Sequence, residues 1–410
     1  MYKKLAASAL VLGLCQPAFA ADLFTVTATV NTTTQSFGFS NVSDAIDKMQ
    51  VAGLQNSNLN YTPTSAASIA LDFRGLPMTV SYAADSAKMT FNVSSIGMQP
   101  VTFEGKGTTA AAARDNANEQ FKDFLKKNGG DVVNRIMKKL AEVSPVDPIA
   151  GNPNSLQSQM VTTDFDRNFT SHASNIKAAQ PGSATSNLIG VGLRFGSYDI
   201  NGKKSDSYTI PLSYTNRSDL DPRRQLTISA PLTYTAVEGG KVYSFNPGIS
   251  YRIPMNDEWA LTPAIGYGLT GSVELGSLGQ MVSGSLTSSY VINRDGYDIA
   301  IGNMVGFYQS LKAQAGDYSY DPGIKNTIFR NGVMLSRPAS LFGKGMSVEY
   351  SLIDTRFTGD ALYTNGYDEI GVTLGTNKGA NSARSYLRAG VSYLTSSQAK
   401  GFTANLGYWF

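Results

Sequence analysis

The second half of this sequence repeats one pattern, in which apolar side chains alternate with small, polar or charged ones over runs of about ten residues. In the first run Ile189, Val191, Leu193 and Phe195 share one face, and glycines with Arg194 occupy the other. A tilted strand needs this length to cross a bilayer, and no segment after residue 20 reaches the roughly 20 apolar residues of a membrane helix. Such a chain can enter a membrane only as a closed barrel, because lipid offers no partner for unpaired backbone groups.

The number of these runs predicts the architecture. An even number of strands returns the chain to the side on which the barrel began, as in single-chain bacterial barrels. The 40 glycines, 21 tyrosines and 19 phenylalanines suit a small lumen with aromatic girdles. We therefore expect an all-β transmembrane barrel of about 12 antiparallel strands over residues 187–410. The strands are expected at 189–195, 208–214, 226–234, 243–253, 259–269, 281–292, 297–308, 326–336, 346–354, 367–375, 385–394 and 401–410.

Residues 21–143 mix helical and strand periods, which predicts a small α+β domain before the barrel. Strands are expected at 24–30, 68–73, 78–82, 88–93 and 100–104, and helices at 41–53, 108–127 and 131–142. Residues 144–186 carry four prolines among many polar residues and have no period, so they predict a polar linker. That linker is too long for an ordinary connection, and it is therefore either disordered or threaded through the barrel lumen.

The first 20 residues predict a secretory signal peptide. Lys3 and Lys4 precede an apolar run, and Ala18-Phe19-Ala20 is a small-x-small site, so we expect cleavage near Ala20 and an outer-membrane location. Lipidation at Cys15 is the weaker alternative, because Leu14 stands where a small residue is needed. Cys15 is the only cysteine, so a mature chain has neither a disulfide nor a thiolate metal site.

The charge balance excludes a nucleic-acid partner. The chain has 34 Lys and Arg against 31 Asp and Glu, and without the leader 32 against 31, which leaves no basic footprint. The string 266–271 matches a dinucleotide fingerprint but ends an expected strand and opens no helix, so no cofactor is predicted. One histidine and no mature cysteine also exclude a metal site built from these ligands.

The last strand carries the most specific signal in the chain, an outward-facing apolar series that ends on the C-terminal aromatic residue. It resembles the terminal-strand signal of bacterial outer-membrane proteins, which implies outer-membrane lipid and the barrel assembly machinery as partners. The alternative is a soluble sandwich whose edge strand ends on phenylalanine. The series is Phe402, Ala404, Leu406, Tyr408 and Phe410.

A barrel of 12 strands after a linker and an N-terminal region resembles the translocator domain of autotransporters, over about residues 165–410. The resemblance implies that the segment before the barrel crosses the lumen and connects to a surface passenger. Residues 21–143 lack the repeats of the long β-helical passengers common in that family. The side of the membrane that this domain occupies therefore stays open, and an envelope protein or peptidoglycan is a further possible partner.

Six charged residues fall at lumen-facing positions of the expected strands. They either line a pore constriction, grip the linker as it passes, or fill a small barrel with salt bridges. These residues are Arg194, Arg252, Arg330, Glu349, Glu369 and Arg388.

No catalytic residue is predicted. His172 with Ser174 faintly resembles the pair of the outer-membrane phospholipase, but it lies in the polar linker, where nothing holds nucleophile and base in reach. Asp164 and Asp166 lie in the same linker without an enclosing pocket to tune them. Lysines at 126, 127, 138 and 139 predict solvated helix faces or a partner contact.

Three functions remain from the sequence. The first is an autotransporter-like translocator that anchors the small domain. The second is a channel or transport barrel with a periplasmic domain, in which the lumen charges set ion selectivity. The third is a membrane-embedded lipid-acting enzyme that uses His172.

Overall fold

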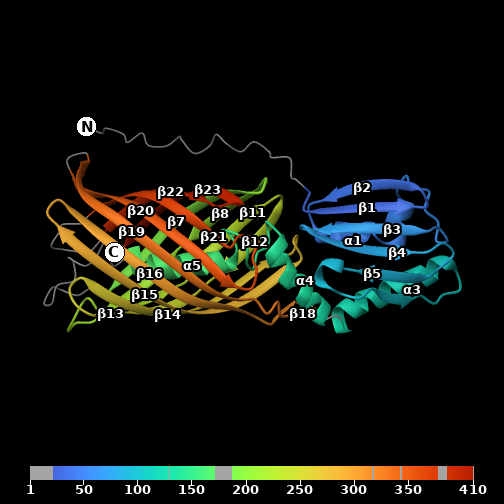
Figure 1. Cartoon of the computed structure of the whole chain (residues 1–410), viewed down its shortest axis with the longest axis horizontal. Coiled ribbons are helices and arrows are strands. Elements are labelled where there is room, and N and C mark those ends of the chain that lie inside the picture. The colour runs from blue at the N-terminus through green and yellow to red at the C-terminus, as the bar shows by residue number, and fades with distance from the viewer. Residues whose placement is uncertain are drawn as a thin grey trace, which may run out of the picture.

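The computed structural model of the chain describes residues 22–128, 130–170, 187–315, 318–341, 344–376 and 386–409. The expected signal peptide, His172 and Phe410 lie outside these residues. The described chain forms a long β-barrel with a smaller α+β domain seated against one of its ends (Figure 1).

Twelve strands of the described chain close the barrel, as the sequence predicts. Closure comes from antiparallel pairing of the last strand with the first, from Ala399 opposite Ile200 to Trp409 opposite Gly190. Three strands are each interrupted once, at a proline, and so consist of two segments. The strands are β7 (Leu188–Ile200), β8 (Lys203–Ile210) with β9 (Leu212–Arg217), β10 (Gln225–Ser229) with β11 (Leu232–Val237), β12 (Gly240–Phe245) with β13 (Gly248–Pro254), β14 (Trp259–Ser272), β15 (Ser277–Arg294), β16 (Tyr297–Leu311), β19 (Lys325–Leu341), β20 (Lys344–Gly359), β21 (Gly366–Thr376), β22 (Tyr386–Thr395) and β23 (Ala399–Trp409).

The barrel wall is apolar outside and polar inside. Leu193, Leu352 and Ile370 each expose about 60% of their surface outward, whereas hydroxyl residues such as Thr235 and Thr287 are buried in the lumen. A barrel in water has the reverse arrangement, because exposed apolar area is unfavourable there. The pattern is that of an outer-membrane barrel and excludes the soluble sandwich.

The first four members of the C-terminal series lie on this outer face. Phe402, Leu406 and Tyr408 are exposed there, and Ala404 is partly covered within the same alternation. The side chains of β23 that the sequence assigns to lipid therefore point away from the lumen.

The N-terminal domain is a six-stranded antiparallel sheet packed against helices, with strand order β2-β1-β3-β4-β5-β6. Its strands are β1 (Phe24–Val30), β2 (Thr33–Phe39), β3 (Ala67–Phe73), β4 (Leu76–Tyr82), β5 (Lys88–Asn92) and β6 (Val101–Glu104). Its helices are α1 (Val42–Lys48), α2 (Val51–Gln55), α3 (Ala110–Asp123), followed by a π-helical turn over Phe124–Asn128, and α4 (Gly130–Val143).

Strand β2 is absent from the sequence prediction. None of its residues is buried, because it lies at the edge of the sheet, so it shows no apolar alternation. It forms through its hairpin with β1, in which Val30 lies opposite Thr33. Only pairing with a neighbour reveals such a strand.

The connection after β16 folds into a short hairpin, β17 (Ala313–Ala315) and β18 (Tyr318–Tyr320). Within the described ranges no helix is long and apolar enough to cross a membrane. The same residues contain no group of three His, Cys, Asp or Glu side chains that could hold a metal ion.

Candidate functional site: the plugged lumen

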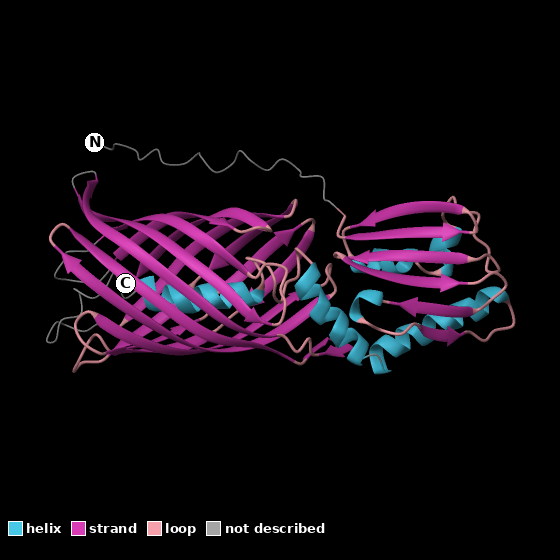
Figure 2. Ribbon diagram, in the orientation of Figure 1, coloured by secondary structure: helices cyan, strands magenta, loops and turns pink. Residues whose placement is uncertain are grey.

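The chain between the two domains lies inside the barrel. Most residues from Ser144 to Phe165 are buried, and helix α5 (Leu156–Phe165) runs along the barrel axis within the wall of strands (Figure 2). The Ser155 side chain caps this helix by accepting a hydrogen bond from the Ser158 amide, and a π-helical turn over Asp166–Thr170 continues it. The expected absence of regular structure is therefore wrong for this stretch.

The sequence shows no helical pattern for α5 because the lumen around it is partly polar. A helix in water shows an apolar stripe every 3.6 residues, but α5 buries Gln157, Ser158 and Asp164 as well as Leu156 and Met160. A lumen lined by hydroxyl and charged side chains accepts both kinds of residue, so no stripe is required.

The apolar side chains of α5 and the turn after it pack against a wall of glycines. A side-chain carbon added at Gly302 of β16 would lie 2.5 Å from the Phe169 ring, and one at Gly268 of β14 would lie 2.6 Å from the Met160 sulfur. At Gly332 of β19 the distance to the Phe165 ring would be 3.0 Å. These strands can carry nothing larger where the helix passes. Gly268 belongs to the string 266–271, which lies in β14 and serves this approach.

Polar bonds fix α5 to several strands. Asp164 accepts hydrogen bonds from Tyr308 on β16 (2.9 Å) and from Arg167 (2.6 Å). The Gln157 amide donates to the Asn326 side-chain oxygen on β19 (3.0 Å). Asp164 and Asp166, which the sequence assigns to an open linker, are enclosed by the barrel, and that assignment is corrected.

The six charged residues all face the lumen, and most meet an opposite charge. Arg194 pairs with Asp166. Asp166 belongs to the segment 144–170 inside the lumen, which we call the plug. Arg330 pairs with Glu369 at 2.7 Å, and its guanidinium lies over the Phe165 ring at 5.2 Å. Three further residues complete the set: Arg388 pairs with Glu349, and Arg252 is buried on β13.

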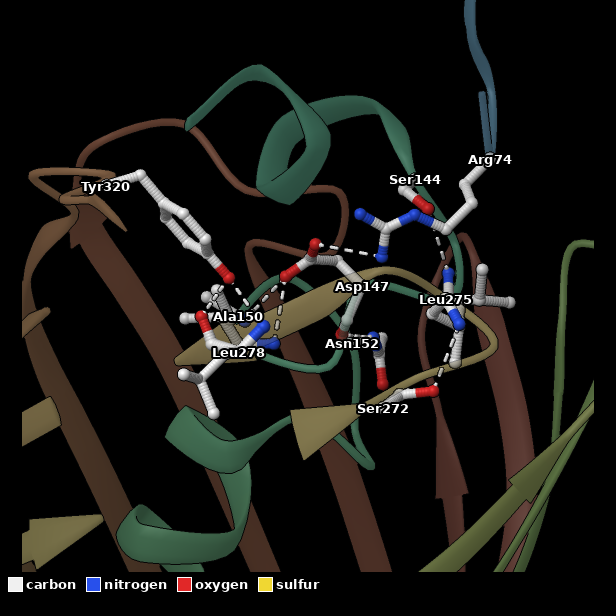
Figure 3. A network of polar contacts seen from close by, with 11 residues as sticks. Arg74, Ser144, Asp147, Ala150, Asn152, Ser272, Leu275, Leu278 and Tyr320 are labelled. Atoms are coloured by element: carbon white, nitrogen blue, oxygen red, sulfur yellow. Dashed lines mark hydrogen bonds and ion pairs between the residues drawn. The ribbon is translucent and has the colours of Figure 1, made fainter. Parts of the chain in front are cut away.

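The N-terminal domain is tied to the barrel mouth by a fully buried ion pair (Figure 3). A guanidinium nitrogen of Arg74 lies 3.5 Å from a carboxylate oxygen of Asp147, and neither side chain is exposed. Asp147 also accepts hydrogen bonds from the amides of Ile149 (2.9 Å) and Ala150 (3.1 Å). Burial raises the pKa of Asp147, and the charge of Arg74 opposes that shift.

Arg74 is held there by an unusual turn. Arg74 and Gly75 form the two-residue β3–β4 hairpin, with φ of 55° and 94°. A left-handed conformation is uncommon for a residue other than glycine, yet it directs Arg74 downward into the junction (Figure 3). Sequence inspection missed the pair, because residues 73 positions apart meet only after both domains have folded.

Barrel loops at this same end also contact the N-terminal domain. The Val42 amide donates to the Glu274 carbonyl oxygen at 2.9 Å, and Lys138 pairs with Asp360 at 2.7 Å. The Tyr363 amide donates to the carbonyl oxygen of Ala141 in α4 at 2.8 Å. Lys138, for which the sequence left a solvated face or a partner contact open, thus contacts the barrel.

Solved structures similar to this chain are outer-membrane barrels. They include the β domain of the Bordetella autotransporter BrkA (14% identity, 55% of this chain and 99% of that one, TM-score 0.43). The translocator domain of autotransporter NalP from Neisseria meningitidis is 12% identical over 62% of this chain and 97% of its own, with a TM-score of 0.45. An outer-membrane channel from Pseudomonas putida F1 is 14% identical over 56% and 98%, with a TM-score of 0.37. No protein-family model and no curated protein matches the chain.

Replacing Gly302 by valine should unseat the plug. The new side chain must enter the space of the Phe169 ring, and overpacking of this kind costs about 1–3 kcal/mol. Thermal unfolding in detergent should show a lower Tm, with faster proteolysis of residues 144–170. Gly284→Val on β15 is the matched control, because a side-chain carbon there meets nothing within 4 Å; equal effects of the two substitutions would contradict the packing.

Removing one partner of the Arg74–Asp147 pair should loosen the junction. Arg74→Met leaves a buried carboxylate without its counter-charge, which costs about 3–5 kcal/mol, whereas the double variant Arg74→Met/Asp147→Leu should recover most of that loss. The measurement is chemical unfolding of the N-terminal domain in the intact chain. Lys138→Met in the half-exposed pair with Asp360 is the control and should cost at most about 1 kcal/mol. If the stability losses of the two single substitutions simply added in the double variant, the energetic coupling between Arg74 and Asp147 would be disproved.

Proposed function

We propose that the protein is an autotransporter-like translocator and anchor that displays its N-terminal α+β domain at the outer surface of the outer membrane. The path of the chain carries this proposal. The domain sits at one barrel end, residues 144–170 run through the lumen, and β7 begins at the opposite end (Figure 1). The chain therefore enters the lumen at one end of the barrel and begins its first strand at the other.

The positions of the barrel termini support this orientation. β7 begins and β23 ends at the barrel end farther from the N-terminal domain (Figure 1). In single-chain bacterial barrels with an even number of strands, short turns and both termini lie on the periplasmic side. The N-terminal domain then faces the exterior, together with the hairpin β17–β18, which belongs to the longest loop at that end.

The size of the lumen determines whether the N-terminal domain could cross the barrel folded or only unfolded. One helix with its contacts occupies much of the barrel interior, so a folded six-stranded domain cannot pass. Residues 22–410 contain no cysteine, and no disulfide can lock the domain before transport. We infer that the domain folds after crossing and that α5 is the segment left in the lumen.

Two partners belong to the same proposal. The outward series of β23, which includes Phe402 and Leu406, suits recognition by the barrel assembly machinery and contact with outer-membrane lipid. If the N-terminal domain is external, its partner would be another surface protein. Peptidoglycan could be its partner only if the domain were periplasmic.

Site-specific proteolysis of intact cells tests the orientation. One variant carries an inserted protease site in the exposed β1–β2 turn at Asn31, and a matched variant carries it in the exposed β15–β16 turn at Asp295. A protease too large for the outer membrane should cut the first variant in intact cells and the second only after permeabilisation. The opposite result would refute surface display and favour a periplasmic partner.

A second candidate is a transport channel, favoured by a cavity of about 300 Å³ that remains beside α5. In planar bilayers the full chain should give small or no current steps, and deletion of residues 156–170 should give open-pore steps. Arg252→Glu in the deleted form should then shift selectivity towards cations, because Arg252 lines the cavity. A deletion variant that folds but stays silent would exclude the channel.

A further inference from the structure

Strand β2 leaves one edge of the N-terminal sheet free. It pairs with β1 on one side, and within the described residues no other strand continues the sheet beyond it. The hairpin that joins β1 to β2 has a two-residue turn, in which Val30 and Thr33 form the closing pair. Hydrogen-bonded and non-hydrogen-bonded pairs alternate along an antiparallel ladder. The backbone amides and carbonyls of Thr34, Ser36 and Gly38 therefore point away from β1, and all three residues are exposed.

The opposite edge of the same sheet is protected. β6 has only four residues, follows Pro100 and ends on Glu104, and the Gln120 side-chain amide donates to the Glu104 carbonyl oxygen at 2.9 Å. Short length, proline, charge and covering groups are the means by which edge strands avoid pairing with other chains. β2 has none of these, because its seven residues include no proline and no ionisable side chain. The fold thus protects one edge and leaves the other able to pair.

The sequence of β2 is complementary to itself. In an antiparallel pair of two β2 strands centred on Ser36, this residue faces its own copy, and Thr34 faces Gly38 of the second copy. Each such pair exchanges two backbone hydrogen bonds, so every outward group of the edge gains a partner. On the other face Phe37 lies opposite Gln35 of the second copy, and its partly exposed ring comes within reach of the second Phe37 ring.

Two charged side chains flank β2 on opposite faces of the sheet. The Lys48 ammonium lies 4.0 Å from the centre of the Phe37 ring, on the face that carries the helices. Asp22 lies on the other face, where a side-chain carbon added at Gly38 would meet its carboxylate. These two charges have opposite signs and the strand itself has none, so the edge presents little net charge to a second copy.

The sheet stands upright on the barrel. Phe24, Phe39 and Phe73 lie side by side at the strand ends nearest the barrel, where Lys203 of β8 donates to the Asp22 carbonyl oxygen at 3.2 Å. The β1–β2 turn is at the far end, so β1 to β4 run along the barrel axis (Figure 1). Two copies in one membrane then have β2 strands that run in the same direction. An antiparallel pair needs opposite directions, and it therefore forms between barrels that point in opposite directions.

We propose that the free edge of β2 is a homophilic binding site, at which the N-terminal domains of two copies join into one continuous antiparallel sheet. Given the surface display proposed above, on which this step rests, the two copies belong to facing outer membranes and the contact holds two cells together. One edge of seven residues gives a weak contact. Many copies on two facing surfaces strengthen it through avidity.

Full-length protein in nanodiscs, with one barrel in each disc, tests the pairing whichever side of a cell the domain occupies. Sedimentation should show disc pairs that increase with concentration, and electron micrographs should show the two discs at opposite ends of each particle. Ser36→Pro should weaken pairing at least about tenfold, because two backbone bonds are lost at the centre of the pair. Proline is tolerated where the amide of an edge strand faces solvent, so the domain should keep its unfolding temperature.

A charge exchange at Ser36 tests whether the partner is a second copy. Ser36→Lys alone and Ser36→Glu alone should each weaken pairing several-fold, because like charges then face each other, and an equimolar mixture of the two should restore it. Thr102→Lys is the matched control, since Thr102 is an exposed hydroxyl residue on the protected strand β6, and it should pair like the unsubstituted protein. Equal pairing of the single variants and their mixture would overturn the proposal.

The nanodisc and protease experiments separate this proposal from surface display. Discs that stay single at every concentration, or that pair side by side, would refute the strand pairing even if the site at Asn31 is cut in intact cells. Opposed disc pairs that respond to the charge exchange would support the strand pairing. If the site at Asn31 were then protected in intact cells, the display would be refuted and with it the contact between cells.

Discussion

The pairing of β23 with β7 is the contact on which the rest of the structure depends. It joins the first and last strands over Gly190–Ile200 and leaves the sheet without an edge. In lipid an open edge would expose unpaired amides and carbonyls at a cost of several kcal/mol each. Closure with 12 strands also sets the diameter, and a barrel of this size holds one helix with a cavity beside it. The buried helix and the polar lumen both follow from that diameter.

The two halves of the barrel wall contact helix α5 in different ways. Strands β14, β16 and β19 approach α5 closely, and glycines at 268, 302 and 332 give Met160, Phe165 and Phe169 their space. Strands β8 to β13 stand back from the helix and carry the three prolines. The glycine wall therefore binds the plug by packing, and the proline wall contacts it through polar bonds such as that from Asn246 to Thr163 (3.1 Å). A cavity of about 300 Å³ remains beside the helix, and residues of β7 to β13 and of β19 to β23 line it.

The junction between the domains uses a charge pair where an apolar contact would also pack. Both Arg74 and Asp147 are fully buried, and bringing two charges out of water offsets much of their attraction. Such a pair adds little stability, but it tolerates only one arrangement, because either charge alone would be left in an apolar setting. The geometry of the hairpin at Arg74 and Gly75 fits this role.

The sequence by itself determined the barrel, its twelve strands and the outward series of β23, because period-two alternation records which side of a strand meets lipid. The same alternation assigns the six charges, from Arg194 to Arg388, to the lumen side of the wall. Only the tertiary structure decided what fills the lumen. Helix α5 has no stripe, since its surroundings are polar on some sides and apolar on others. The Arg74–Asp147 pair joins residues far apart in the chain, and a local sequence pattern carries no record of such a contact.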